Sequence, residues 1–280
     1  MSYTRRIVIL VFTLALLSSC TAYRVNEPDY VSTNAFRINA LLYTPRKMEP
    51  GVKYPGIVLN HSGTSGVDYY SKSWARELSA RGYVVILPQF RGQGGSDGRV
   101  EYAHGEVDDA IAALTKLTDL EYVDRDRVAM VGTGIGGLVT IFALERNPEI
   151  KGAVLIAPWT DMTGYLDNTT GGRRIKRDPY QSEQHRKHIE EYSPAKRYGK
   201  INVPVLILQG ERDKTAKPEA TRKFCDDLKA AGKDVTLVTY PELDHRIMTY
   251  KAPMEEAIKF IEERLNTGGT KPGPDAVAAQ

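Results

Sequence analysis

The chain has 280 residues, of which 41% are hydrophobic and 26% are charged. This composition is typical of a globular protein and fits one large domain. The 38 basic and 35 acidic residues leave a formal net charge of +3. Such a near balance gives no reason to expect a nucleic acid or an acidic partner.

The first 19 residues have the pattern of an export signal. Arg5 and Arg6 precede an apolar run over residues 7–17, which is too short for a comfortable membrane span. The run ends in a Leu-Ser-Ser-Cys motif that finishes at Cys20 and resembles the lipobox of bacterial lipoproteins. We therefore expect removal of the signal peptide, lipidation of Cys20 and a lipid-anchored protein of the bacterial cell envelope, in the outer membrane if the source is Gram-negative. The alternative is an ordinary signal peptide that ends near a cysteine.

Strand and helix patterns alternate along the rest of the chain. Residues 20–34 are polar and are expected to form a tether between the lipid and the domain. Apolar runs predict strands over 36–43, 54–60, 83–87, 128–131, 152–157, 203–209 and 234–240, with a turn over 124–126. Helical spacing is found over 69–81, 106–117, 138–146, 219–230 and 253–265. This alternation predicts an α/β fold with a doubly wound, mostly parallel sheet.

Residues 35–265 are expected to form the folded domain. The alternation breaks over residues 159–199, which hold many polar and charged groups. We interpret them as a small cap insertion over the carboxyl edge of the sheet, and a solvated pair of helices without a substrate role is the alternative. Residues 266–280 are rich in glycine, proline and small side chains and are expected to be a disordered tail.

A glycine-rich stretch separates the predicted strand over 128–131 from the helix that follows it. Gly132 and Gly136 match the outer glycines of the nucleophile elbow, Gly-x-Ser-x-Gly, in which a sharp strand-to-helix turn exposes a serine. The central position holds Gly134 instead of serine. The sequence leaves open whether this glycine is native or was introduced to trap a ligand.

Three further features follow predicted strands, at the edge where open α/β sheets place their ligands. Asp213 is placed to orient a histidine, and His245 is placed to act as a base. Each is weak alone, because such an aspartate is often a helix N-cap and a lone histidine is often a surface group. In the loop that begins at His61, the backbone N–H of Ser62 could bind an oxyanion together with that of Ile135. The order elbow, acid, histidine is that of an α/β-hydrolase.

Residues 35–265 resemble the α/β-hydrolase fold, and specifically its prolyl-oligopeptidase and dienelactone-hydrolase branch. The resemblance is carried by the loop over 88–96, by Tyr-Ser-Pro at 192–194 and by the stretch over 203–210. It implies esterase or peptidase chemistry through an acyl-enzyme. Gly134 then stands at the nucleophile position of a triad with Asp213 and His245.

The missing serine leaves the enzymatic status of the chain uncertain, because acyl transfer needs an oxygen or sulfur nucleophile beside the histidine. Our first hypothesis is a lipid-anchored, catalytically impaired homologue that binds a small-molecule or peptide ligand in the former active-site cleft. The alternative is an active hydrolase of an ester, amide or peptide, which would use Thr133, Ser62 or a water activated by His245. The five histidines show no metal-site spacing, and we expect no metal, cofactor or nucleic acid. Cys225 is expected to be a buried small residue rather than a nucleophile.

Overall fold

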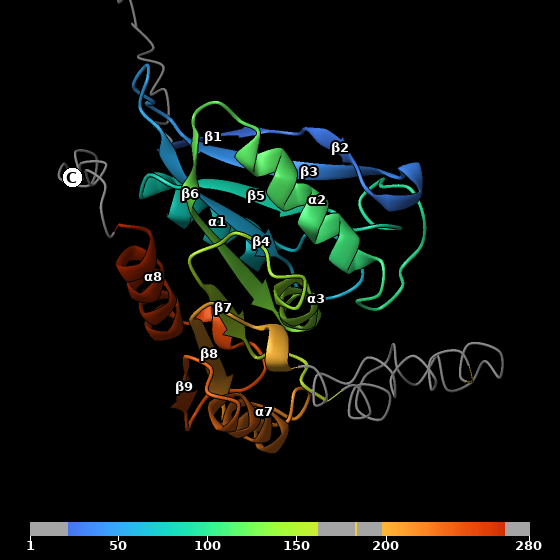
Figure 1. Cartoon of the computed structure of the whole chain (residues 1–280), viewed down its shortest axis with the longest axis vertical. Coiled ribbons are helices and arrows are strands. Elements are labelled where there is room, and N and C mark those ends of the chain that lie inside the picture. Colours follow the sequence, from blue (N-terminus) through green and yellow to red (C-terminus); the bar gives the residue numbers. More distant parts are fainter. Residues whose placement is uncertain (1–21, 162–182, 184–197, 267–280) are drawn as a thin grey trace, which may run out of the picture.

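The computed structural model describes residues 22–161, 183 and 198–266, and in this part of the chain one nine-stranded sheet forms the centre (Figure 1). The strands are β1 Tyr23–Asn26, β2 Asp29–Val31, β3 Arg37–Pro45, β4 Tyr54–Asn60, β5 Val84–Pro88, β6 Val123–Thr133, β7 Ala153–Ile156, β8 Val205–Gly210 and β9 Val235–Tyr240. Their order is β1-β3-β5-β4-β6-β7-β8-β9, with β2 also paired to β3. From β5 to β9 the neighbouring strands are parallel, whereas β1, β2 and β3 pair antiparallel.

Helices cover both faces of the sheet. They are α1 Tyr69–Ala80, α2 Glu106–Thr118, α3 Ile135–Leu144, α7 Pro218–Ala230 and α8 Lys251–Leu265, with short 3-10 helices η1 Thr33–Ala35, η3 Tyr198–Lys200 and η4 Ile247–Thr249. One hydrophobic core joins the sheet to α2, α3 and α7, and a second core joins the opposite face to α1 and α8. The predicted doubly wound, mostly parallel α/β fold is therefore confirmed.

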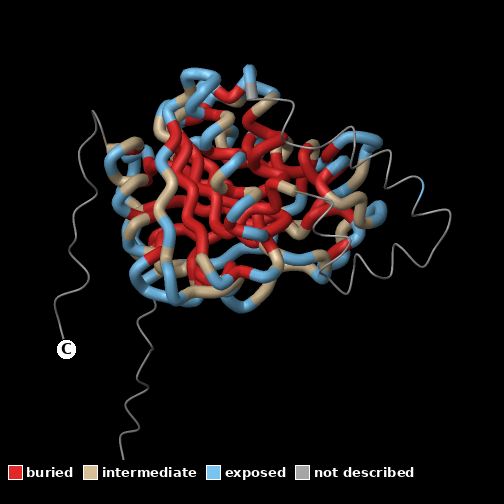
Figure 2. Tube along the Cα trace, turned by 90° about the horizontal axis from the view of Figure 1, so that it is seen from below, coloured by how far each residue is buried: buried red, intermediate tan, exposed pale blue. Residues whose placement is uncertain are grey.

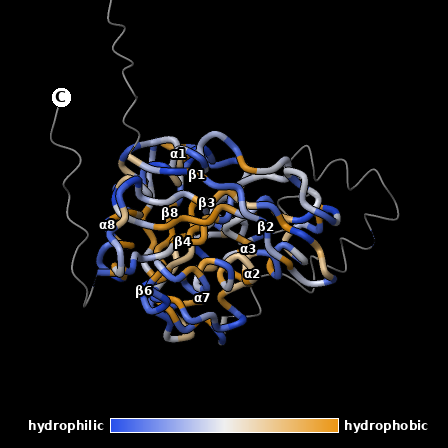
Figure 3. Tube along the Cα trace, turned by 90° about the horizontal axis from the view of Figure 1, so that it is seen from above, coloured by the Kyte–Doolittle hydropathy of each residue, from blue (hydrophilic) through white to orange (hydrophobic). Residues whose placement is uncertain are grey.

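The central strands are buried on both faces. In β4 the consecutive residues Ile57, Val58 and Leu59 are all fully buried, so their side chains fill the two cores alternately. Figure 2 shows the buried strands at the centre of the molecule, and Figure 3 shows hydrophobic residues gathered along the same strands. Continuous apolar runs are typical of parallel sheets with helices on both sides, which is why these strands were readable from the sequence.

Two sequence predictions are wrong about local structure. Residues 23–26 and 29–31, expected in a tether, form β1 and β2 against β3. These short strands pair with backbone groups of β3 and keep most of their side chains exposed, so their polar sequence hides their role. Residues 124–126, expected in a turn, lie within β6, where its pairing with β4 shifts register between Pro55 and Gly56. Near the start of β6, Arg125 and Asp126 are exposed although Val123 is buried, so the charged sequence there resembles a turn.

Several predicted segments lie outside the described residues. They are the signal peptide with Cys20, nearly all of the expected cap over 159–199, and the tail after residue 266. No helix in the part of the chain that the structure describes is long and apolar enough to cross a membrane.

Candidate active site

The glycine-rich stretch forms a sharp turn between β6 and α3. Gly134 lies at the turn with φ 54° and ψ −117°, a backbone conformation that residues with side chains adopt only under strain. Its N–H donates to the Ile156 carbonyl at 3.0 Å, and its carbonyl accepts from the N–H groups of Gly137 at 3.1 Å and Trp159 at 3.1 Å. The turn is thus held by the neighbouring strand β7 and by the segment after it.

The outer glycines are required by close packing of the turn. A Cβ atom placed on Gly132 would lie 2.3 Å from the Gly136 carbonyl oxygen, and one on Gly136 would lie 2.2 Å from the Asn60 carbonyl oxygen. Real Cβ atoms do not approach backbone atoms so closely. The glycine frame of an elbow is therefore explained by the approach of α3 to the ends of β4 and β6.

Asp213 follows β8 and its carboxylate is fixed at both oxygens. Oδ1 accepts from the backbone N–H groups of Thr215 at 2.7 Å and Ala216 at 2.8 Å. Oδ2 lies 2.8 Å from Nδ1 of His245, and the whole residue is only 4% exposed. A buried carboxylate in this position holds the imidazole ring in one orientation and stabilises its protonated form.

His245 follows β9 and turns its other ring nitrogen toward the elbow. Because Nδ1 faces Asp213, Nε2 is the nitrogen left for chemistry. A Cβ atom placed on Gly134 would lie 3.5 Å from this Nε2. The structure therefore brings together the three positions predicted from the sequence, and a serine side chain at position 134 would begin beside the histidine.

A cavity of about 210 Å³ opens beside His245. It is lined by Ser62, Gly63, Asp68, Tyr70, His245, Arg246, Met248 and Thr249. The Ser62 hydroxyl oxygen lies only 2.7 Å from the point where a Cβ on Gly134 would stand. Thr133, weighed as a replacement nucleophile, is 2% exposed and does not line the cavity.

The two backbone N–H groups expected to bind an oxyanion lie at the same place in the fold. Ser62 follows β4 by two residues, and Ile135 is the first residue of α3. Within the described residues neither N–H has a hydrogen-bond partner. Both donors are therefore free to meet a ligand oxygen, and a helix N-terminus favours negative charge there.

Buried aromatic and polar contacts hold the loop that carries Ser62 in place. The His61 ring packs on Phe90 with ring centroids 4.8 Å apart, and its Nδ1 lies 2.9 Å from the Ser62 carbonyl. Burial lowers the pKa of His61, so the ring is neutral and its Nδ1 carries the proton that the carbonyl accepts. Further along, the side chains of Gln93 and Gln89 accept from the backbone N–H groups of the loop at residues 66 and 67.

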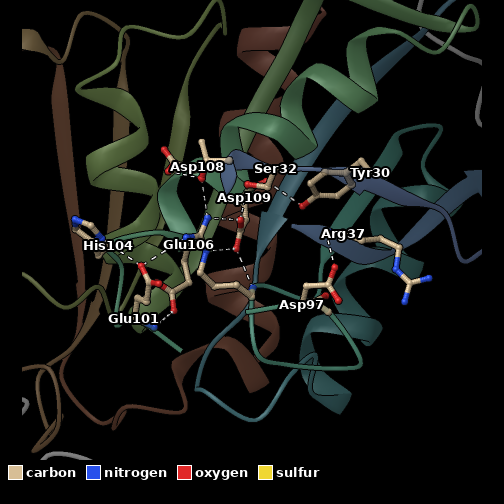
Figure 4. A network of polar contacts seen from close by, with 12 residues as sticks. Tyr30, Ser32, Arg37, Asp97, Glu101, His104, Glu106, Asp108 and Asp109 are labelled. Carbon is tan, nitrogen blue, oxygen red and sulfur yellow. Dashed lines mark hydrogen bonds and ion pairs between the residues drawn. The ribbon is translucent and has the colours of Figure 1, made fainter. Parts of the chain in front are cut away.

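A buried ion-pair network anchors the segment that carries these glutamines (Figure 4). The guanidinium of Arg91 donates to both carboxylate oxygens of Asp109, at 2.8 Å and 3.1 Å, and Ser32 donates to the same carboxylate at 2.6 Å. Glu106 lies in the same cluster, where burial raises its pKa from 4.5 to about 7. This network was not predicted from the sequence. Its only signal was a charged start to the helix over 106–117.

The described residues contain no group of three or more His, Cys, Asp or Glu side chains placed to hold a metal ion. Beside the elbow, the structure places the hydrogen-bonded Asp213–His245 pair, the backbone N–H groups of Ser62 and Ile135, and the Ser62 hydroxyl.

Comparison with known proteins decides the family. Residues 70–267 match the prolyl oligopeptidase family, Peptidase_S9. The chain belongs to this family. The resemblance noted in the sequence is thus confirmed for its prolyl-oligopeptidase side.

The curated relatives of this chain are mostly longer proteins. The uncharacterized peptidase YuxL of Bacillus subtilis is 26% identical over 236 residues, which cover 79% of this chain and 35% of YuxL. Dipeptidyl peptidase 8 of Mus musculus is 28% identical over 249 residues, covering 79% of this chain and 27% of that protein. The uncharacterized peptidase YtmA of Bacillus subtilis is 26% identical, with 76% of this chain and 83% of YtmA covered. The chain thus spans about a third or less of YuxL and of dipeptidyl peptidase 8.

Solved structures share this fold. The acylaminoacyl peptidase of Pyrococcus horikoshii superposes with a TM-score of 0.75 at 17% identity, over 91% of this chain and 44% of that chain. The esterase Pf2001 of Pyrococcus furiosus superposes with a TM-score of 0.71 at 18% identity, over 88% of this chain and 94% of that chain. At these identities the likeness establishes the α/β-hydrolase fold and no more.

Proposed function

We propose that this chain is a lipid-anchored member of the prolyl oligopeptidase family that binds a peptide or a small acyl compound and turns it over poorly. One observation carries the proposal: Gly134 offers no side chain at the point that faces His245 Nε2. The acyl-enzyme mechanism begins with an oxygen or sulfur that gives its proton to the histidine. At the elbow of this chain there is no such atom.

The rest of the site supports binding of a carbonyl group. The free N–H groups of Ser62 and Ile135 would hold the carbonyl oxygen, and His245 would lie over the carbonyl carbon. Serine hydrolases stripped of their triad keep roughly 10³–10⁴-fold acceleration over water through such oxyanion donors and binding. We expect hydrolysis by this chain at about that level, with His245 as the base.

The peptide part of the proposal comes from the relatives. Several are named as peptidases, although the chain covers only part of their length. The membrane part comes from the lipobox-like motif that ends at Cys20, whose lipid would anchor the domain in the cell envelope.

A second candidate is an active hydrolase of an ester, amide or peptide bond. It is favoured by the intact Asp213–His245 hydrogen bond of 2.8 Å, a pairing that binding alone does not require. Under this candidate the nucleophile lies outside the elbow.

Hydrolysis and binding measured separately test the proposal. We expect p-nitrophenyl butyrate to be hydrolysed far below the rate of about 1 s⁻¹ that marks the slow end of ordinary enzymes. We also expect N-acetylated peptide amides to show saturation-transfer NMR signals that persist in the His245→Ala variant. Turnover at 1 s⁻¹ or faster that disappears in His245→Ala would favour the second candidate. Absence of binding by every peptide and ester tried would refute the binding role.

The lipid anchor has its own test. Expression with an alkyne fatty acid is expected to label the chain and to place it in the membrane fraction. Cys20→Ala should abolish both. Release of the unlabelled, soluble chain from cells that express the unmodified protein would instead favour an ordinary signal peptide.

A further inference from the structure

The hydroxyl of Ser62 occupies the space that a nucleophile at the elbow would use. Its oxygen lies 2.7 Å from the point where a Cβ on Gly134 would stand, and that same point is 3.5 Å from His245 Nε2. Ser62 and His245 also line the same cavity. Within the described residues neither the Ser62 hydroxyl nor Nε2 has a hydrogen-bond partner, so nothing there engages either atom.

We propose that Ser62 is a relocated nucleophile, which accepts an acyl group in the cleft with His245 as its base. The inference rests on the proposed function, because the acyl compound must first bind there, and it adds slow covalent chemistry to that binding. Rotation about the Cα–Cβ bond of Ser62 moves its oxygen among three staggered positions. Nucleophile and base in free enzymes are often farther apart than in the reacting complex.

The absence of a side chain at position 134 is what makes room for this arrangement. A Cβ at that position would press on the Ser62 oxygen at 2.7 Å, well inside ordinary contact, whereas glycine leaves the oxygen free. Thr133 cannot take the same role, because it is 2% exposed and lies off the cavity. Ser62 is thus the hydroxyl of the cavity lining that lies beside both the elbow and the histidine.

The reaction balances as an ordinary acyl transfer. The Ser62 oxygen attacks the carbonyl carbon of an ester, and its proton passes to His245 Nε2, whose charge Asp213 stabilises. The N–H of Ile135 lies at the adjacent helix start to meet the developing oxyanion. The tetrahedral intermediate then breaks its bond to the leaving alcohol, which departs with the proton from Nε2. Water later attacks the acyl-Ser62 ester and releases the acid, again with His245 as base.

Covalent labelling tests the assignment. A fluorophosphonate probe is expected to add one equivalent to the unmodified protein, and peptide mass spectrometry should place it on Ser62. The label should be absent from Ser62→Ala. The label should form at least about 10²-fold more slowly in His245→Ala, because a positioned base contributes at least that factor to the rate. With p-nitrophenyl butyrate we expect a burst of about one equivalent of p-nitrophenolate followed by slow turnover.

Ser65→Ala is the matched control, because Ser65 is an exposed hydroxyl of the same loop that does not line the cavity. It should label like the unmodified protein. Labelling elsewhere, labelling that survives in Ser62→Ala, or no labelling at all would overturn the assignment. Peptide amide binding, measured on the unmodified protein and on Ser62→Ala, separates the two proposals. If the unmodified protein binds peptide amides but is not labelled, only the assignment of Ser62 as nucleophile is refuted. If it neither binds nor is labelled, the cleft is refuted as a binding site.

Discussion

Restoring a serine at the elbow is the sharpest test of how much of the hydrolase site survives. Gly134→Ser would place a Cβ 3.5 Å from His245 Nε2. All other parts of the mechanism are already positioned, from the fixed Asp213 carboxylate to the oxyanion donors. We expect the variant to hydrolyse short-chain p-nitrophenyl esters at least 10²-fold faster than the unmodified protein.

The expected gain is smaller than a complete triad would give. Loss of the nucleophile from a working triad costs about 2 × 10⁶ in kcat. Here the new Cβ would lie 2.7 Å from the Ser62 hydroxyl, which must rotate away before the site can work. The Ser62 Cβ is 3.6 Å from the same point, an ordinary contact. The double variant with Ser62→Ala should therefore be the more active of the two.

The same substitution should lower stability. A side chain at φ 54° and ψ −117° stores roughly 1–3 kcal/mol of backbone strain. In a domain of this size each kcal/mol lowers Tm by about 2–4 °C. Gly134→Ala is the matched control, because it has the same Cβ and the same strain but no hydroxyl.

Ester hydrolysis and thermal unfolding of Gly134→Ser and Gly134→Ala together test the expected gain in activity and the expected loss of stability. Both variants should show a similar fall in Tm, and only the serine variant should gain activity. Equal activity of the two, in folded proteins, would show that His245 and the oxyanion donors are no longer arranged for acyl transfer. Unchanged Tm in both would show that the turn at position 134 is not strained as described.

Three further predictions concern stability and reactivity. Burial raises the pKa of Glu106 from 4.5 to about 7, so the stability it contributes is full below pH 4.5 and is lost as the pH rises through about 7. The unmodified protein should therefore lose about 3 kcal/mol of unfolding free energy between about pH 5 and pH 8, measured by urea unfolding, and Glu106→Gln should not show this loss. An unchanged pH dependence in the variant would contradict the raised pKa. Gly136→Ala should lower the free energy of unfolding by about 1–3 kcal/mol or more, because its Cβ would lie 2.2 Å from a backbone oxygen. A Cβ on Gly199 would meet no atom within 4 Å, so Gly199→Ala should change the free energy of unfolding by no more than about 0.5 kcal/mol. Cys225 is fully buried and burial raises its thiol pKa, so a thiol reagent should react only as fast as the domain opens; rapid reaction in the folded state would contradict this.

Local sequence patterns were enough to predict most of the fold. The apolar run over 54–60 predicted β4 with its observed bounds, because a strand buried on both faces needs apolar residues throughout. The glycines at 132 and 136 predicted the elbow, because only glycine permits that approach of helix to strand. Strand and helix order placed Asp213 and His245 at one edge of the sheet, where the structure joins them by a hydrogen bond.

Patterns that depend on distant partners were not readable. Residues 23–26 and 29–31 lie in a largely polar stretch, and only their pairing with β3 makes them strands. Arg91 lies in a glycine-rich loop whose partner, Asp109, is 18 residues further along the chain, and Ser32 joins that carboxylate from 77 residues away. Nothing in the local sequence signals a buried ion pair until both partners are placed.

The sequence by itself determined the fold class, the elbow and the loss of its serine, because each is written in the identity and spacing of neighbouring residues. Only the tertiary structure decided what stands in the place of that serine. It is the hydroxyl of Ser62, which follows β4 and lies beside Gly134 and His245. These two residues are more than 70 and more than 180 positions further along the chain. A Cβ on Gly134 would lie 2.7 Å from the Ser62 oxygen and 3.5 Å from His245 Nε2. These distances depend on parallel strands packed side by side, so they cannot be predicted from any run of neighbouring residues.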